Sequence, residues 1–151
     1  MPVTIAPSAE ACQALVDRIN TGTLYRLPTP AEYSRKVIDA LEEVSNLRVD
    51  VEAFDEVQLN ETLTVEDATS HTIRVWVRER LADKEPETID RTMLVLRRIF
   101  QRLNNWDSAN RRVRVWEADI NAKETPDKSA LRDLQQFVGY ITLRVEVGAS
   151  A

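Results

Sequence analysis

The sequence predicts a single α+β domain, in which a mixed, mostly antiparallel sheet of about five strands is flanked by two main helices. Three observations between residues 72 and 117 support this fold class. Residues 72–81 alternate between apolar and polar types, as in a half-buried strand. In residues 86–103 the apolar positions recur at intervals of four and three, as on one side of a helix. Alternation then resumes over residues 112–117, so the order is strand, long helix, strand.

Other elements are expected on both sides of this unit. A first helix is predicted over residues 8–20, with Ser8 as its N-cap. A strand is predicted over 47–53, a short helix over 127–135 and a long final strand over 137–147. We expect one domain spanning the whole chain, with loose termini at 1–7 and 148–151.

Residues 23–45 fit two interpretations. With period two they form a long edge strand interrupted by prolines. With period 3.6 they form a helix that starts near Thr29, with Tyr33, Val37 and Leu41 along one side. The local signals favour the helix slightly.

Composition excludes several classes of protein. The chain has 151 residues, 43% of them hydrophobic and 30% charged, which is ordinary for a globular domain. Its net charge of −5 argues against a surface that coats nucleic acid. One cysteine and one histidine exclude an intrachain disulfide and a Cys/His zinc site. We also expect no signal peptide and no membrane-spanning segment.

Catalytic motifs are absent from the sequence. It has no G-x-S-x-G, no H-E-x-x-H and no glycine-rich phosphate loop, since it contains only three glycines. His71 is expected to be a surface or capping residue, and Cys12 a small apolar residue on the first helix. We therefore predict no catalytic, cofactor-binding or metal-binding residue, and a protein that is not an enzyme.

Residues 54–70 are predicted to form a long acidic loop, because they show no clear periodicity and the stretch between Val49 and Ile73 has no lysine or arginine. A solvated loop is the default interpretation, since the spacing of a calcium-binding loop is missing. In a ring-shaped assembly the loop would instead face a partner or line a channel and repel DNA. Its acidic residues are Asp55, Glu56, Glu61, Glu66 and Asp67.

Two groups of side chains are candidate subunit contacts. The aromatic group falls on strand sides that otherwise carry arginine and glutamate, which is typical of an interface core with a charged rim; cover by the first helix or a loop of the same chain is equally compatible. The basic group would bind phosphates or pair with a neighbouring subunit, and the acidic composition favours the second role. The aromatic group is Trp76, Trp116 and Tyr140, and the basic group is Arg97, Arg98, Arg102, Arg112 and Arg114.

The order of elements and four phrases resemble the tail-terminator or tail-completion proteins of long-tailed bacteriophages. The phrases are the opening helix at 14–19, Leu-Glu-Glu-Val-Ser-Asn-Leu-Arg-Val-Asp-Val at 41–51, Ile-Arg-Val-Trp-Val at 73–77, and Leu-Gln-Gln-Phe-Val-Gly-Tyr-Ile-Thr-Leu at 134–143. The resemblance covers residues 10–147.

The resemblance implies a virion structural protein, assembled in the host cytoplasm as a hexameric ring in the neck that ends the tail and joins it to the head. Its implied partners are other copies of the chain, the tail tube protein, the head–tail connector and closure proteins, and the sheath protein if the tail is contractile. DNA would pass through the lumen without specific binding. For the ambiguous segment it implies an extended course over 23–37 with a short helical turn at 39–44, and we predict a strand there.

Two other functions fit the same sequence. The first is a head-closure or connector-adaptor ring protein of the same neck. The second, from a different class, is a nucleic-acid-binding accessory domain that uses the arginine-rich helix, and steep salt dependence of DNA binding would identify it.

Overall fold

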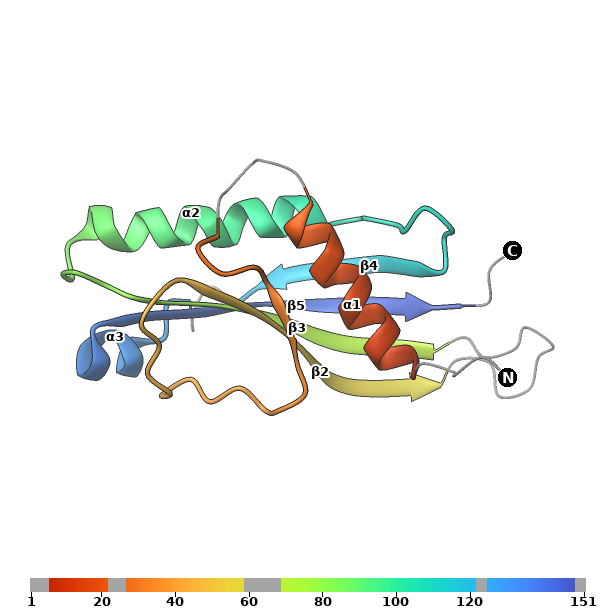
Figure 1. Ribbon diagram of the computed structural model, residues 1–151, viewed down its shortest axis with the longest axis horizontal. Helices are drawn as coiled ribbons and strands as arrows, with labels where there is room; N and C mark the ends of the chain where they lie inside the picture. The colour runs from red at the N-terminus through yellow and green to blue at the C-terminus, as the bar shows by residue number, and fades with distance from the viewer. Residues whose placement is uncertain (1–5, 22–26, 59–68, 122–124, 149–151) are drawn as a thin grey trace.

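The computed structural model describes residues 6–21, 27–58, 69–121 and 125–148, and it has the predicted α+β architecture with three helices and a five-stranded sheet (Figure 1). In chain order the elements are α1 (Pro7–Asn20), β1 (Glu32–Ser34), β2 (Arg48–Gln58), β3 (Thr69–Arg80), α2 (Pro86–Leu103), β4 (Val113–Ile120), α3 (Lys128–Leu134) and β5 (Gln136–Val147).

The sheet has the strand order β1-β2-β3-β5-β4. β1 runs parallel to β2, and every other neighbouring pair is antiparallel. The sheet is therefore mixed and mostly antiparallel, as predicted. Because β1 and β4 are last in the order, each has a strand partner on one side only among the described residues.

One face of the sheet carries the hydrophobic core. In Figure 1, α1 crosses the strands and α2 runs along them on this face. Leu15 of α1 and Leu96 and Ile99 of α2 are fully buried against the inward residues of the strands, such as Val75 and Ile141. We call this side the core face.

The spacing of apolar residues predicted α2 well, and the observed helix is Pro86–Leu103. Proline suits the first turn of a helix, where no backbone donor is lost. Asp83 lies just before the helix and its Oδ1 accepts hydrogen bonds from Thr88 Oγ1 at 2.6 Å and from the backbone N–H of Glu85 at 3.0 Å. These bonds lower the pKa of the Asp83 carboxyl. In α1, by contrast, the N-cap is Ala6 and not the predicted Ser8.

Within residues 23–45 the only strand among the described residues is β1, three residues long. In place of the predicted helical turn at 39–44 there is a single hydrogen-bonded turn, in which the Glu42 N–H donates to the Asp39 carbonyl at 3.1 Å, and no helix. Residues 22–26 lie outside the described residues. Asn20 marks where the edge begins, because its side chain accepts from the Ala31 N–H at 2.8 Å and donates to the Ala31 carbonyl at 3.1 Å. These two bonds satisfy the backbone that a longer edge strand would leave open.

The predicted loop at 54–70 was too long. β2 continues to Gln58 and β3 begins at Thr69, so Asp55 and Glu56 belong to a strand. His71 was also misassigned to the surface. It is buried within β3, and Thr69 Oγ1 lies 2.6 Å from its Nε2.

Candidate interaction surface

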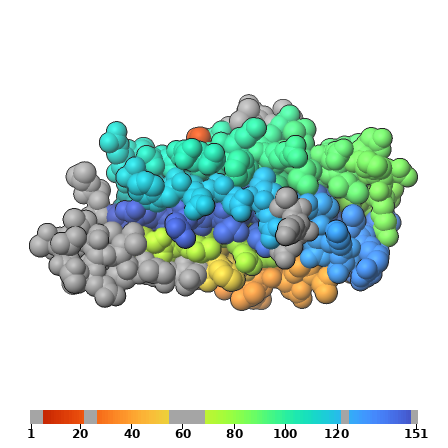
Figure 2. Space-filling model, turned by 180° about the vertical axis from the view of Figure 1, so that it is seen from behind, coloured from red at the N-terminus to blue at the C-terminus, as the bar shows by residue number. Residues whose placement is uncertain are grey.

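The side of the sheet opposite α1 and α2, which we call the outer face, is divided into a covered half and an open half. The cover consists of α3 and of residues 35–46, an irregular segment between β1 and β2 that we call the strap. In Figure 2, parts of β3, β4 and β5 are at the surface between α2 along the top and the orange strap and blue α3 at the bottom and right. The two halves differ in what their polar residues do.

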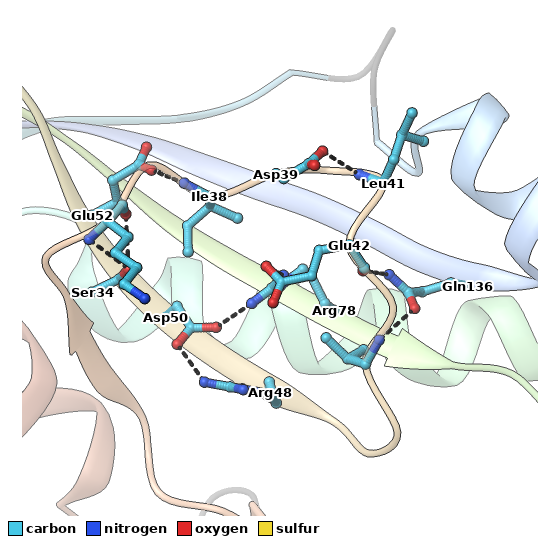
Figure 3. Close-up of polar contacts among 12 residues, drawn as sticks. Ser34, Ile38, Asp39, Leu41, Glu42, Arg48, Asp50, Glu52, Arg78 and Gln136 are labelled. Atoms are coloured by element: carbon cyan, nitrogen blue, oxygen red, sulfur yellow. Dashed lines mark hydrogen bonds and ion pairs between the residues drawn. The ribbon is translucent and has the colours of Figure 1, made fainter.

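Buried polar side chains of the sheet hold the strap in place (Figure 3). Gln136 accepts from the Val44 N–H at 2.9 Å and donates to the Glu42 carbonyl at 2.8 Å. The carboxylate of Glu52 accepts from the backbone N–H of Ile38 and from Trp76 Nε1 at 3.4 Å. The strap thus satisfies its backbone with side chains instead of with a neighbouring strand.

An ion pair lies under the strap. The guanidinium of Arg78 is only 2% exposed, and it contacts Asp50 at 2.9 Å and Glu42 at 3.4 Å. Arg48 lies on the other side of the Asp50 carboxylate at 3.3 Å. Since Asp50 is also 2% exposed, each buried charge depends on the other.

Trp76 belongs to this covered half. Its ring packs on Tyr140 with centroids 4.8 Å apart, in a cluster with Val138 of β5, Ala130 of α3 and the strap residue Ile38. Trp76 is therefore only 6% exposed, and of the two expectations for this residue the structure shows cover by a segment of its own chain.

The open half begins at Arg74, two residues before Trp76 on β3. Its guanidinium lies 4.1 Å from the ring centroid of Phe54 and 4.6 Å from that of Tyr140, as in a cation–π sandwich. A shift of register between Ala53 and Asp55 makes Phe54 the extra residue of a β-bulge, and its side chain is 57% exposed. Arg74 has no ion pair among the described residues.

A second bulge exposes Trp116 on the edge strand β4. The register shift between Val115 and Glu117 leaves Trp116 as the extra residue, 52% exposed. Its Nε1 donates to Glu146 at 2.7 Å, and Arg114 lies over its ring at 4.7 Å. Two bulged strands therefore each present one aromatic ring with a stacked arginine on the open half.

Two of the predicted interface arginines are used inside the chain. α1 and α2 end side by side, and Arg102 Nε donates to the Arg18 carbonyl at 2.8 Å while Arg18 Nε donates to the Arg102 carbonyl at 3.3 Å. Each arginine thus satisfies a carbonyl in the last turn of the other helix, where a positive charge is favourable. Arg112 forms an ion pair with Glu10 of α1.

The other three arginines are accessible. Arg97 and Arg98 lie on the exposed side of α2, beside the 47% exposed Leu94. Arg114 is also exposed, with Asp107 at 3.4 Å. Of the predicted acidic residues, Asp55 and Glu56 are in β2, while Glu61, Glu66 and Asp67 lie outside the described residues.

Sequence reasoning did not find the buried polar group of Asp50, Glu52, Arg78 and Gln136. Alternation placed all but Gln136 on the polar side of their strands, which looks the same whether that side meets water or a strap. The two bulges were also missed, because no glycine or proline marks them.

The described ranges contain no group of three or more histidine, cysteine, aspartate or glutamate side chains arranged to hold a metal ion. Burial, with a smaller contribution from the charge of Glu52, raises the pKa of the Cys12 thiol to about 12, so the nucleophilic thiolate is scarce at neutral pH. Within the same ranges, no helix is long and apolar enough to cross a membrane.

Comparison with known proteins assigns no family. No family model matches the chain, and no curated protein matches it. One similar solved structure is described as the sheath/tube terminator, in the extended state, of PVC, an extracellular contractile injection system. Its TM-score is 0.39 at 9% sequence identity, and the match covers 100% of this chain and 58% of that chain. Our chain thus spans less than two thirds of that protein's length.

Proposed function

We propose that this chain is a non-enzymatic structural protein that assembles with copies of itself into a ring, and that the ring ends the tail tube of a phage particle and joins it to the head. The observation that carries the proposal is the open half of the outer face, where Phe54 and Trp116 are 57% and 52% exposed and carry stacked arginines. The order of elements and the quoted phrases support the tail position.

The open half has the chemistry of a protein–protein contact. Aromatic and arginine side chains dominate the binding energy of interfaces, because they combine large apolar area with directed hydrogen bonding. Trp116 is held by Glu146, and Arg74 is held between two rings, so both lose little side-chain entropy on binding. A surface organised in this way favours a stable contact with another protein over exposure to solvent.

In this ring the exposed side chains have separate partners. Trp116 and Arg114 contact a neighbouring subunit, and the ring of Tyr140 holds Arg74 in position by stacking. Arg97 and Arg98 on α2 contact the tube, the sheath of a contractile tail, or a connector or closure protein. The acidic residues between β2 and β3 face the channel, where their charge keeps passing DNA from binding. By the same resemblance the ring has six subunits.

The test is the mass of the purified protein by light scattering, at low and physiological salt, alone and with the tail tube protein of the same particle. We expect a closed ring, either alone or on contact with the tube protein. Trp116→Ala should reduce assembly, and Glu87→Ala in the first turn of α2 is an exposed control. A wild-type chain that stays monomeric and does not bind the tube protein would contradict the proposal.

Two results would point to the alternative functions. A ring that binds a connector protein but not the tube protein would favour the head-closure or adaptor position. A monomer that binds DNA with steep salt dependence would favour a nucleic-acid-binding domain that uses Arg97 and Arg98.

A further inference from the structure

We infer that the two edges of the sheet meet in the assembly, so that the open part of β4 in one copy lies beside β1 of the next copy. This inference rests on the proposed ring, and it names the surfaces that close it. Its evidence is that both edges have open backbone, that their charges are opposite in sign, and that each exposes an apolar side chain.

The β4 edge is open along its second half only. Over its first half, the Val115 N–H donates to the Trp106 carbonyl and the Ser108 N–H donates to the Val113 carbonyl, both at 2.8 Å. Beyond Val115 the outward edge has no strand partner within the described ranges. The open part is therefore 116–120, which an extended segment of another chain can extend.

The β1 edge is open over a shorter stretch of three residues. Asn20 closes the backbone at Ala31, and the next three residues, Glu32–Ser34, form the strand. After it, the Ser34 hydroxyl donates to the Lys36 carbonyl at 2.8 Å and turns the chain into the strap. Each edge thus has a short stretch of open backbone, and contacts within the chain limit that stretch.

Charges at the two edges are opposite in sign. Glu117 and Asp119 are exposed on β4, and Arg35 and Lys36 are exposed where β1 passes into the strap. None of these four residues forms an ion pair within the part of the chain that the structure describes. Glu32, the acidic residue of β1, is already opposite Arg48 at 3.7 Å. The edges are therefore complementary to each other and not to themselves.

Each edge also exposes one large apolar side chain. Trp116 precedes the acidic pair on β4, and Val37, which is 90% exposed, follows the basic pair after β1. Burying them together would add an apolar contact to the charge pairs.

Strand directions allow the match. β4 is antiparallel to β5, β5 to β3 and β3 to β2, and β1 is parallel to β2, so β1 and β4 run in opposite directions. A neighbour related by rotation about an axis along the strands places its β1 antiparallel to β4. That order sets Arg35–Val37 beside the start of the open stretch, at Trp116 and Glu117. Because the two edges differ, the contact is head-to-tail, and such a contact closes into a ring when the rotation between neighbours divides a full turn evenly.

Charge reversal tests this pairing. Variant A carries Glu117→Lys and Asp119→Lys, and variant B carries Arg35→Glu and Lys36→Glu. Each variant alone places like charges across the contact, and we expect its association constant to fall by about tenfold or more, as measured by light scattering across a concentration series. The control, Asp90→Lys with Asp133→Lys, changes exposed charges away from both edges and should assemble like wild type.

Mixing A with B provides the decisive arm. In an alternating ring every contact joins a basic edge to an acidic one, so the equimolar mixture should recover the wild-type mass. Circular dichroism and thermal unfolding of each variant confirm that it is folded. Rings formed by A or B alone, or no recovery in the mixture, would overturn the edge pairing. Neither result would contradict the proposed ring itself. A wild-type chain that never assembles would instead contradict the proposed function itself.

Discussion

The two faces of this sheet are built from the same strands but are stabilised in different ways. The core face is continuous and apolar, and α1 and α2 cover it with fully buried side chains such as Leu15, Leu96 and Ile99. The outer face holds a buried ion pair under an irregular strap at one end and exposed aromatic–arginine stacks at the other. Alternation along a strand separates two faces, but it does not say which polar residues meet water.

Arg74 and Arg78 make this difference concrete. They lie four residues apart on the same side of β3, and both are arginines on an alternating strand. Arg78 is 2% exposed and paired with Asp50, whereas Arg74 lies between two rings at the open surface. The first contributes to folding, and the second is available for binding.

The largest expected effect comes from separating the buried pair. Arg78→Met should lower the free energy of unfolding by about 3–5 kcal/mol, because the Asp50 carboxylate stays buried without its partner. Arg74→Met, the matched change on the open half, should lower it by less than about 1 kcal/mol. Urea unfolding followed by circular dichroism measures both. Equal losses would mean that the two halves do not differ.

Truncating the core should cost nearly as much. Leu96→Ala removes a fully buried side chain of α2 and should lower the free energy of unfolding by about 2–5 kcal/mol through lost burial and a cavity. Leu94→Ala on the same helix removes an exposed side chain and should change it by less than about 0.5 kcal/mol. A comparable loss for both would place the exposed side of α2 in a packed environment of the isolated chain.

A smaller effect is expected at Gly139 of β5, where side chains of Thr125 and of Leu96 on α2 lie close to the backbone. A Cβ there would lie 2.8 Å from Thr125 Cγ2 and 3.2 Å from Leu96 Cδ1. Gly139→Ala should therefore overpack the site and lower the free energy of unfolding by about 1–3 kcal/mol. Gly148→Ala meets no atom within 4 Å and serves as the control in the same thermal unfolding series. No loss at Gly139 would contradict this close approach.

The smallest effect concerns Cys12, whose pKa is raised to about 12 by burial. The folded state holds the thiol proton more tightly than the unfolded chain, so Cys12 contributes stability below about pH 9 that is lost as the pH rises toward 12. Wild type should therefore lose more thermal stability than Cys12→Ala between pH 8 and pH 11. At pH 8 a thiol reagent should react only after unfolding, and rapid labelling of the folded protein would contradict the burial.

Sequence periodicity predicted most of the fold because long amphipathic elements have strong local signals. α2 was predicted to the residue, and β3, β4 and β5 to within a few residues. Within residues 23–45 the extended interpretation holds for β1 alone among the described residues, because the side chains of Glu52, Gln136 and Arg78 decide the course of the strap from far along the chain. Asp55, Glu56 and His71 were misplaced because the pairing of β2 with β3 extends past the last clear alternation.

For the candidate site, the sequence predicted the composition but not the division of roles. Trp76, Arg102 and Arg112 were grouped with Trp116 and Arg114, since all five have the same residue types in similar local patterns. The structure buries Trp76 under the strap and uses Arg102 and Arg112 within the chain. Such roles depend on contacts between residues distant in sequence, which a period of two or 3.6 does not encode.

The most direct test of the edge pairing is a covalent link between the two edges. A chain with Arg35→Cys and Glu117→Cys carries one exposed thiol at each edge, while Cys12 stays buried and does not react. With a short bis-maleimide, denaturing electrophoresis should show a ladder of covalent multimers that stops at the size of the ring, and each single variant should stop at the monomer. If the double variant forms a ring of full native mass but yields only monomers after cross-linking, the edge pairing is contradicted.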